Sequence, residues 1–318
     1  MSKQRIFTLQ EAFLQETNYI ENRLSGKILP IHTGFPKWDE TYLNGFEWGY
    51  IVALAGMSGV GKTTLLSQLE TNICGLNPES NFKVLNFNYE MSARRLVGKK
   101  IASKLGKSTR QLYSADKVDN ISSRELEAVK KHQNSLLKYD INYVEFPGNV
   151  KEMSETIDNF AKIKGVGNTM NSENALLVTL DHPLIVKKDS EDERNMLINL
   201  MAMFNEKKKM YPKSLFVLVC QLNRDIESTE RKAAFGASKI LNYPQKSDIM
   251  GSDAIYQFSD AVIILHAPEK LGLLTYGPHS YPTNGLIYAH HIKARDGDSC
   301  ITLFKNTLSK SKLTEISL

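Results

Sequence analysis

The chain has 318 residues, of which 42% are apolar and 24% charged, and its formal net charge at pH 7 is +5. These values are typical of a globular protein, and they exclude wholesale disorder, a collagen-like repeat and a disulfide-stapled miniature domain. The charge is compatible with a polyanionic partner but is far too small for a protein that coats nucleic acid by charge alone.

The cysteines and the apolar stretches indicate the compartment. Cys74, Cys220 and Cys300 are scattered and lack metal-ligand spacing, so we expect reduced thiols and no structural zinc. The N-terminus has no apolar core of signal-peptide length, and no stretch approaches the roughly 20 apolar residues of a membrane span. We therefore expect a cytoplasmic protein without a membrane partner.

The first predicted element is an amphipathic helix. Thr8 and Glu11 have the spacing of a capping box, and apolar residues then recur at helical spacing, namely Leu9, Phe13, Ile20 and Leu24. We expect residues 1–28 to form this linker helix and its connector, and residues 29–318 to form the main domain. An isolated helix of this length is marginal in water, so its apolar stripe must cover this chain's own core or a neighbouring subunit.

From residue 50 onward, short apolar runs alternate with helical segments, which predicts an α/β fold with a mostly parallel central sheet flanked by helices. The predicted strands are residues 50–55, 83–88, 141–146, 176–180, 215–220, 261–265 and 286–292. We expect helices over residues 63–74, closed by Gly75, from the Ser92 cap toward Gly106, and after the capping boxes of Ser122 with Glu125 and Asn149 with Glu152. Residues 266–284 are rich in turn residues, and the sequence leaves open whether they are ordered.

A phosphate-binding motif lies between the first predicted strand and its helix. Residues 56–63 read G-M-S-G-V-G-K-T, a complete G-x-x-x-x-G-K-[ST] pattern. Its glycines let backbone N–H groups turn toward a phosphate, and the helix N-terminus adds partial positive charge. Lys62 is expected to reach the β and γ oxygens, and Thr63 to ligate Mg²⁺. The predicted nucleotide contacts are Gly56, Ser58, Gly59, Val60, Gly61, Lys62, Thr63 and Thr64.

Polar residues follow three other predicted strands. Asp181 is the candidate carboxylate for the metal ion, and Glu90 is the candidate for orienting and deprotonating a water molecule. Gln221 is placed to sense the γ-phosphate or the water, because its amide both donates and accepts. Such strand ends face one crevice in a parallel sheet. A solvated carboxylate at Glu90 and a simple strand terminus at Gln221 remain alternatives.

The order of these segments resembles the RecA-like ATPase domain of DnaB-type replicative helicases, from about Leu29 to Lys305. The resemblance implies ATP and Mg²⁺ as cofactors, with Glu90 activating water, Asp181 as the Walker B carboxylate and Gln221 as the γ-phosphate sensor. It also implies that Lys293 and Arg295 enter the nucleotide site of a neighbouring subunit, although an exposed strand end is the alternative for this pair. The segments that carry the resemblance are GFPKWDE, GMSGVGKTT, NFNYEMS, LLVTLDHPLI, LVCQLNR, DIMGSDAIYQFSDAVIIL and HHIKARDGD.

The same resemblance implies a motor that assembles into a ring, a hexamer in this family, and that translocates on single-stranded DNA to separate duplex. A primase or a loader is a candidate partner, but the family's N-terminal primase-contacting domain has no counterpart, since residues 1–28 leave room for one helix. The DNA-contacting loop also differs, because residues 248–253 read D-I-M-G-S-D where the family usually has an Arg-Glu pair before its Ser-Gly. A basic side chain is therefore lost from this loop.

Candidate DNA contacts lie after two of the predicted strands, and solvated charged faces are the alternative for them. They are Lys187, Lys188, Arg194, Lys246, Gly251 and Ser252, with Arg231, Lys232 and Lys239 in the same segments. Two other functions stay open, which are a RecA- or KaiC-like ATPase of recombination or regulation and a non-motor ATP-binding helicase paralogue or loader. A small-molecule kinase fits less well, because its cationic lid would have to come from a basic pair far downstream.

Overall fold

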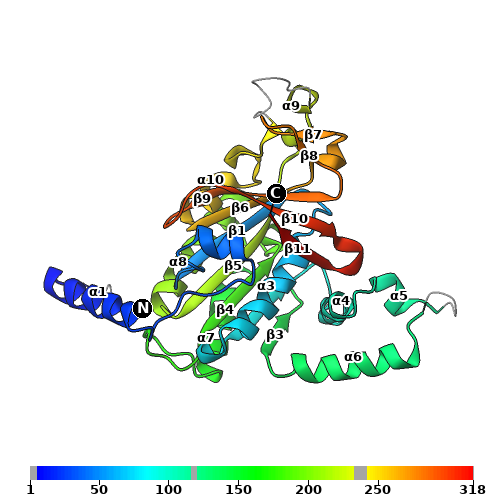
Figure 1. Ribbon diagram of the computed structural model, residues 1–318. Coiled ribbons are helices and arrows are strands. Elements are labelled where there is room, and N and C mark those ends of the chain that lie inside the picture. Colours follow the sequence, from blue (N-terminus) through cyan, green and yellow to red (C-terminus); the bar gives the residue numbers. More distant parts are fainter. Residues whose placement is uncertain (1–5, 116–119, 233–241, 318) are drawn as a thin grey trace.

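A nine-stranded sheet forms the centre of the computed structural model, which describes residues 6–115, 120–232 and 242–317 (Figure 1). In these residues the strand order is β11-β10-β9-β6-β1-β5-β4-β2-β3. The run from β6 to β3 is parallel, and β9, β10 and β11 add an antiparallel edge. The strands are β1 Tyr50–Gly56, β2 Lys83–Asn88, β3 Asp140–Val144, β4 Leu176–Asp181, β5 Ser214–Gln221, β6 Ala261–His266, β9 Leu286–Ala294, β10 Ile301–Thr307 and β11 Lys312–Ile316. The predicted α/β fold with a mostly parallel sheet is therefore confirmed.

Helices cover both faces of this sheet, and the alternation of side chains along β1 shows why. Ile51, Ala53 and Ala55 enter the core under α7, α8 and α10, whereas Val52 and Leu54 enter the core under α2 and α3. Strands buried on both faces consist of continuous apolar runs, as the central ones do here. The helices are α2 Pro36–Thr41, α3 Lys62–Leu76, α4 Ala93–Leu105, α5 Thr109–Tyr113, α6 Ser123–Leu136, α7 Val150–Ile163, α8 Glu193–Met210, α9 Thr229–Lys232 and α10 Ser252–Phe258.

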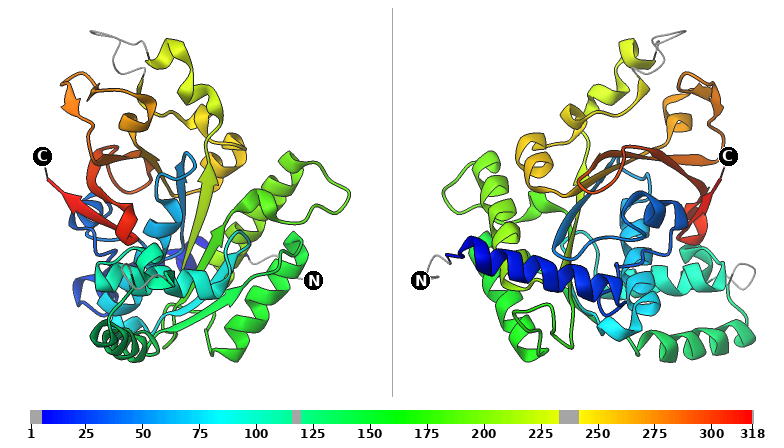
Figure 2. Two further views of the ribbon diagram at one scale, coloured as in Figure 1. Left: turned by 90° about the vertical axis from the view of Figure 1, so that its right-hand side faces the viewer. Right: turned by 60° about the vertical axis from the view of Figure 1, so that its left-hand side comes forward.

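Short segments follow the carboxyl ends of the central strands. They are the 3-10 helices η2 Pro183–Ile185, η3 Arg224–Glu227, η5 Lys246–Asp248 and η6 Pro268–Leu271, and the hairpin of β7 Thr275–Tyr276 with β8 Tyr281–Pro282. Figures 1 and 2 show α9 and this hairpin rising at the same end of the molecule. Two further 3-10 helices are η1 Pro78–Ser80 and η7 Leu308–Lys310.

The N-terminal helix α1 (Leu9–Leu24) projects from this body (Figure 1). The capping box of Thr8 and Glu11 is present. None of the residues of α1 is buried, and the predicted apolar stripe faces solvent, with Leu9 86% and Phe13 71% exposed. The stripe therefore does not cover the described core of its own chain.

Most predicted elements are present, but some bounds need correction, among them those of β3, which ends at Val144 and not at residue 146. Helix α3 does not end at Gly75, because the Asn77 side chain donates to the Ile73 carbonyl and closes the helix after Leu76. Strands β10 and β11 were missing from the predicted set, which also ended β9 two residues early. Residues 266–284 contain η6 and the β7–β8 hairpin. No helix in the described parts of the chain has the length and apolarity that crossing a bilayer requires.

Candidate nucleotide-binding site

The phosphate loop connects β1 to α3, and its backbone conformation requires glycine. Gly61 precedes α3 with φ of +103°, which is a left-handed conformation. A Cβ atom on Gly61 would lie 2.6 Å from Cδ2 of Leu308, so the chain also approaches too closely for a side chain. Val60 is buried and anchors the loop from below. The loop geometry fits the predicted phosphate cradle.

Lys62 is the first residue of α3, and its ammonium group is folded back over the loop. Nζ donates to the carbonyl oxygens of Gly56 at 2.7 Å and Met57 at 2.8 Å. Burial lowers the pKa of Lys62, and the negative charge of Asp181 opposes this effect. The Lys62 ammonium group therefore donates to neutral carbonyl oxygens beside the N–H groups of the loop. This arrangement is well suited to bind an anion.

Thr63 and Asp181 form the pair expected to hold the metal ion. Thr63 Oγ1 donates to Asp181 Oδ2 at 2.7 Å, across 118 residues of sequence. Burial raises the pKa of Asp181, and the hydrogen bond from Thr63 acts in the opposite direction. Among the described residues no group of three or more His, Cys, Asp or Glu could hold a metal ion. A hydroxyl and one carboxylate suit Mg²⁺, which keeps several waters and completes its shell with phosphate oxygens.

A cavity of about 340 Å³ joins these groups to the other predicted catalytic residues. Glu90 and Gln221 both line it, from the ends of β2 and β5, as the parallel sheet predicts. Ser58, Gly59, Gly61, Lys62, Thr63, Thr64 and Asp181 also line it, while Gly56 and Val60 do not. The structure thus brings together predicted residues from four strand ends, which the sequence places up to 163 positions apart, from Ser58 to Gln221.

Four residues of this cavity were not predicted, which are Met91, Lys99, His182 and Leu308. Lys99 lies on α4, where burial lowers its pKa while the charges of Asp181 and Glu90 raise it. Leu308 comes from η7, beyond a strand that the sequence analysis missed. No motif in the sequence marks Lys99, because Glu90 precedes α4 and shares no helix with it.

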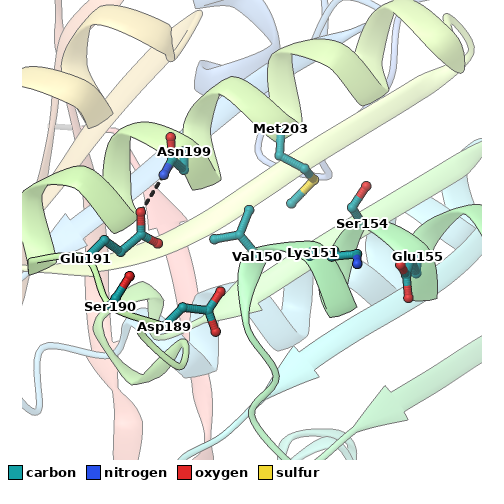
Figure 3. Close-up of a pocket in the computed structure, with 9 residues that line it drawn as sticks. All are labelled: Val150, Lys151, Ser154, Glu155, Asp189, Ser190, Glu191, Asn199 and Met203. Atoms are coloured by element: carbon teal, nitrogen blue, oxygen red, sulfur yellow. Dashed lines mark hydrogen bonds between the residues drawn. The ribbon is translucent and has the colours of Figure 1, made fainter. Parts of the chain in front are cut away.

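A larger cavity of about 560 Å³ lies elsewhere, between α7, α8 and the loop before α8 (Figure 3). Its wall carries the carboxylates of Glu155, Asp189 and Glu191, and Lys151 is the only basic side chain among the described residues that line it. A surface with this excess of negative charge repels a triphosphate. The smaller cavity at the phosphate loop is therefore the candidate nucleotide site, although it is not the largest.

Lys293 and Arg295 lie far from the nucleotide cavity of their own chain. Strand β9 runs antiparallel to β6, so its carboxyl end at Ala294 pairs with Ala261 at the amino end of β6. The phosphate loop follows the opposite end, where Gly56 pairs with Leu265. These two ends are separated by four residue steps, or roughly 13 Å along the sheet.

Local partners hold both basic side chains at that far end. Arg295 forms an ion pair with the buried Asp260, yet its side chain remains 54% exposed. Lys293 Nζ donates to the Tyr256 carbonyl at 2.7 Å and lies 5.0 Å from the centre of the Tyr256 ring. Neither residue lines the nucleotide cavity of its own chain.

The first group of candidate DNA contacts lies between η2 and α8. The backbone N–H of Lys187 donates to the Gly148 carbonyl at 2.9 Å, and Lys188 pairs with Glu193 at 3.3 Å. Arg194 is exposed on the first turn of α8. Because this segment follows β4, it lies at the same end of the sheet as the phosphate loop.

The second group follows β5 and is joined to the nucleotide site through the backbone. Lys246 lies in η5, and Gly251 and Ser252 begin α10. The Met250 N–H donates to the Gln221 carbonyl at 3.0 Å, so this loop is tied to the residue expected to sense the γ-phosphate. Lys239, in the same segment, lies outside the described residues.

Asp248, which begins the altered DNA-contacting loop, is not exposed. It is buried and forms an ion pair with Arg231, whose guanidinium also donates to the Tyr243 carbonyl. Arg231 is consequently occupied inside the protein. This observation argues against Arg231 as a free contact for DNA.

Comparison of the sequence with known protein families identifies the family of this chain. The model of the DnaB-like helicase C terminal domain matches residues 30–300. The chain belongs to this family. Its predicted resemblance to DnaB-type helicases is thereby confirmed, and no curated protein matches the DnaB-like chain significantly in sequence.

Solved structures support the fold of this DnaB-like domain. One structure, described as an ATPase domain, aligns with a TM-score of 0.78 at 15% identity, covering 98% of this chain and 100% of that chain. A DnaB-like replicative helicase, described with its interactions with primase, aligns with a TM-score of 0.75 at 14% identity, covering 100% of this chain and 69% of that chain. The KaiC-like protein PH0186 from Pyrococcus horikoshii OT3 aligns with a TM-score of 0.54 at 17% identity, covering 91% of this chain and 100% of that chain.

Proposed function

We propose that the chain is an ATP-dependent replicative DNA helicase, a ring-forming motor that translocates on single-stranded DNA and unwinds duplex. The main support for this proposal is that the nucleotide cavity and Arg295 lie at opposite ends of one sheet. A cation at the far end cannot serve its own phosphate loop, but it can serve that of the next copy in a head-to-tail assembly. Such contacts close into a ring, and a hexamer is the size that the family resemblance implies.

The proposed reaction is hydrolysis of ATP at the interface between two copies. Glu90 accepts a proton from a water molecule while the water oxygen attacks the γ-phosphorus, and the bond to the bridging oxygen of ADP breaks. Gln221 orients this water, and Lys62 binds the transferred group. Thr63 and Asp181 would hold Mg²⁺, which would supply positive charge against the phosphates. Arg295 and Lys293 of the next copy stabilise the charge that develops on the γ-phosphoryl group, so hydrolysis depends on assembly.

Helix α1 supports this assembly because it contacts its own body through polar residues and leaves its apolar face exposed, the reverse of an ordinary amphipathic helix. Its polar side faces its own body, where Tyr19 donates to Glu47 and Arg23 pairs with Glu47 at 3.6 Å. Its apolar stripe is exposed, so the free energy gained by burying it is available only to another molecule. We therefore propose that α1 docks on a neighbouring copy.

A cavity of about 580 Å³ between α4 and α5 has the chemistry to receive α1. Its lining combines Met91, Thr109 and Tyr113 with four basic residues, Arg94, Arg95, Lys99 and Arg110. Helix α1 carries the acidic residues Glu11, Glu16 and Glu21 besides its stripe. An acidic helix and a groove lined mostly by basic residues are complementary in charge, and Met91 and Tyr113 offer apolar contacts for the stripe.

The loops after β4 and β5 are the proposed contacts for single-stranded DNA. Lys187, Lys188, Arg194 and Lys246 supply cations for its phosphates, and the backbone at Gly251 and Ser252 supplies N–H donors. Through the hydrogen bond from Met250 to Gln221, a change at the γ-phosphate would reach this loop directly. A primase or a loader is the proposed protein partner.

The test is the ATPase rate as a function of protein concentration, with and without single-stranded DNA, together with strand separation on a forked duplex. A motor hydrolyses ATP faster per chain as copies assemble, responds to single-stranded DNA and separates the fork. A rate that is independent of both concentration and DNA would contradict the proposal.

One observation favours a second candidate, a non-motor ATPase of the same fold. Burial of Asp248 against Arg231 removes one cation from the DNA-contacting loop and places a neutral pair there. A protein of this kind hydrolyses ATP on assembly but neither binds single-stranded DNA nor separates the fork. The same experiment distinguishes the two candidates.

A further inference from the structure

Lys270 reaches the phosphate loop from a distant part of the chain. It lies in η6, after β6, and its Nζ donates to the Gly59 carbonyl oxygen at 2.7 Å. A Cβ atom built on Gly59 would lie 3.0 Å from this Nζ, so the approach is close. The preceding residue fixes η6, because Glu269 Oε2 accepts the N–H of Gly285 at 2.9 Å. Lys270 is thus held over the loop by a tethered element.

Two lysines share this one loop without a counter-ion. Lys62 donates to the carbonyls of Gly56 and Met57, and Lys270 donates to that of Gly59. Within the described parts of the chain, neither ammonium forms an ion pair with a carboxylate. Burial lowers the pKa of Lys62, the charges of Asp181 and Glu90 oppose that lowering, and the positive charge of Lys270 makes a smaller contribution in the same direction as burial. Two like charges held beside one cradle repel each other until an anion lies between them.

We infer that Lys270 is a second cationic contact for the phosphates of the nucleotide, supplied by the same chain from the loop after β6. This inference rests on the proposed ATP function. Lys62 is buried and lines the cavity, whereas Lys270 is exposed and lies beside the cavity at Gly59, so Lys270 can exchange its carbonyl partner for a phosphate oxygen. A lysine is a compact charge on a flexible stem and does not require one fixed geometry.

The charge of the ligand determines what Lys270 contributes. Each further phosphate group adds negative charge, so a cation at the mouth stabilises a bound triphosphate more than a bound diphosphate. Lys270 is therefore a specificity-determining residue, which favours ATP over the product ADP. This preference assists release of the product after each hydrolysis.

The test compares nucleotide binding by the full chain carrying Lys270→Met with binding by the wild type. Isothermal titration calorimetry with Mg²⁺ and a slowly hydrolysed ATP analogue gives one Kd, and titration with ADP gives the other. Lys305→Met is the matched control, because Lys305 is exposed on β10, whereas Lys270 donates to the phosphate loop at Gly59. We expect Lys270→Met to raise the Kd of the analogue about tenfold, as loss of a charge-assisted hydrogen bond predicts.

For ADP we expect a change of about threefold or less, since the smaller ligand charge gains less from Lys270. Lys270→Arg should retain most of the preference, and the effect of Lys270→Met should shrink as salt rises. An unchanged Kd for the analogue, or an equal loss for both ligands, would overturn the inference while leaving the proposed function intact. A wild type that binds neither ligand would instead overturn the proposed function and this inference with it.

Discussion

A buried ion pair between α3 and α4 predicts a large loss of stability when Lys100 is replaced by methionine. Lys100 Nζ lies 2.9 Å from Glu70 Oε2, and the two side chains are 5% and 1% exposed. The same Nζ donates to the Ser67 carbonyl at 2.9 Å. Glu70 further accepts hydrogen bonds from Thr179 at 2.9 Å and from Asn86. This network joins the helix of the phosphate loop to the helix that follows Glu90.

Lys100→Met leaves the Glu70 carboxylate buried without its counter-charge. Breaking a buried pair in this way costs about 3–5 kcal/mol of the free energy of unfolding. A typical domain has about 5–15 kcal/mol in total, so the loss is a large fraction of the stability. The double variant Lys100→Met with Glu70→Gln removes the uncompensated charge while keeping an acceptor for Thr179. We expect it to recover about 2 kcal/mol of this loss.

The assay is urea unfolding of the full chain, followed by circular dichroism, for the wild type, the single variant and the double variant. Equal slopes of free energy against urea would show that the variants share one native state. A loss below about 1 kcal/mol, the value of an exposed pair, would refute the reasoning. A double variant that is no more stable than the single variant would refute it as well.

Three further predictions concern the site and the assembly. Gly61→Ala should abolish the rise in melting temperature on adding nucleotide, because its Cβ would lie 2.6 Å from Leu308 and φ is +103°; a retained rise would contradict this. Asp181→Asn should raise the melting temperature at neutral pH, since burial raises the pKa of Asp181 and penalises the ionised form. That gain should shrink as the pH falls through the raised pKa toward 3.8, and a gain that does not vary with pH would refute the assignment. Phe13→Ser should change the stability of a dilute protomer by no more than about 0.5 kcal/mol while reducing the particle mass in light scattering; an unchanged mass would exclude α1 from assembly.

Local signals in the sequence predicted most of the fold. The capping boxes at Thr8, Ser122 and Asn149 are all present, because such a motif depends on residues only three positions apart. The central strands were recognised because burial on both faces makes them continuous apolar runs. Strands β10 and β11 were not, since they lie toward one side of the sheet and are only partly buried, so neither has a continuous apolar run along its length.

The site residues at strand ends could be predicted from the sequence. The residues that reach the site through tertiary packing could not. Asp181, Glu90 and Gln221 follow from the rule that parallel strands meet at one edge. Leu308 and Lys270 reach the phosphate loop through turns that carry no motif, so only the folded chain reveals them. The sequence likewise could not decide whether the apolar stripe of α1 covers the core of its own chain. Hydrophobic periodicity shows which face of a helix is apolar, but it does not show what that face packs against.

The most direct test of a site shared between two copies is complementation between two inactive variants. Glu90→Gln lacks the base but retains Arg295, and Arg295→Ala lacks the cation but retains Glu90. Random mixing restores both groups at roughly a quarter of the interfaces of a head-to-tail ring. The account predicts that each variant alone is nearly inactive and that the mixture recovers ATPase activity. A mixture no more active than its components, or an Arg295→Ala protein with the wild-type rate, would contradict it.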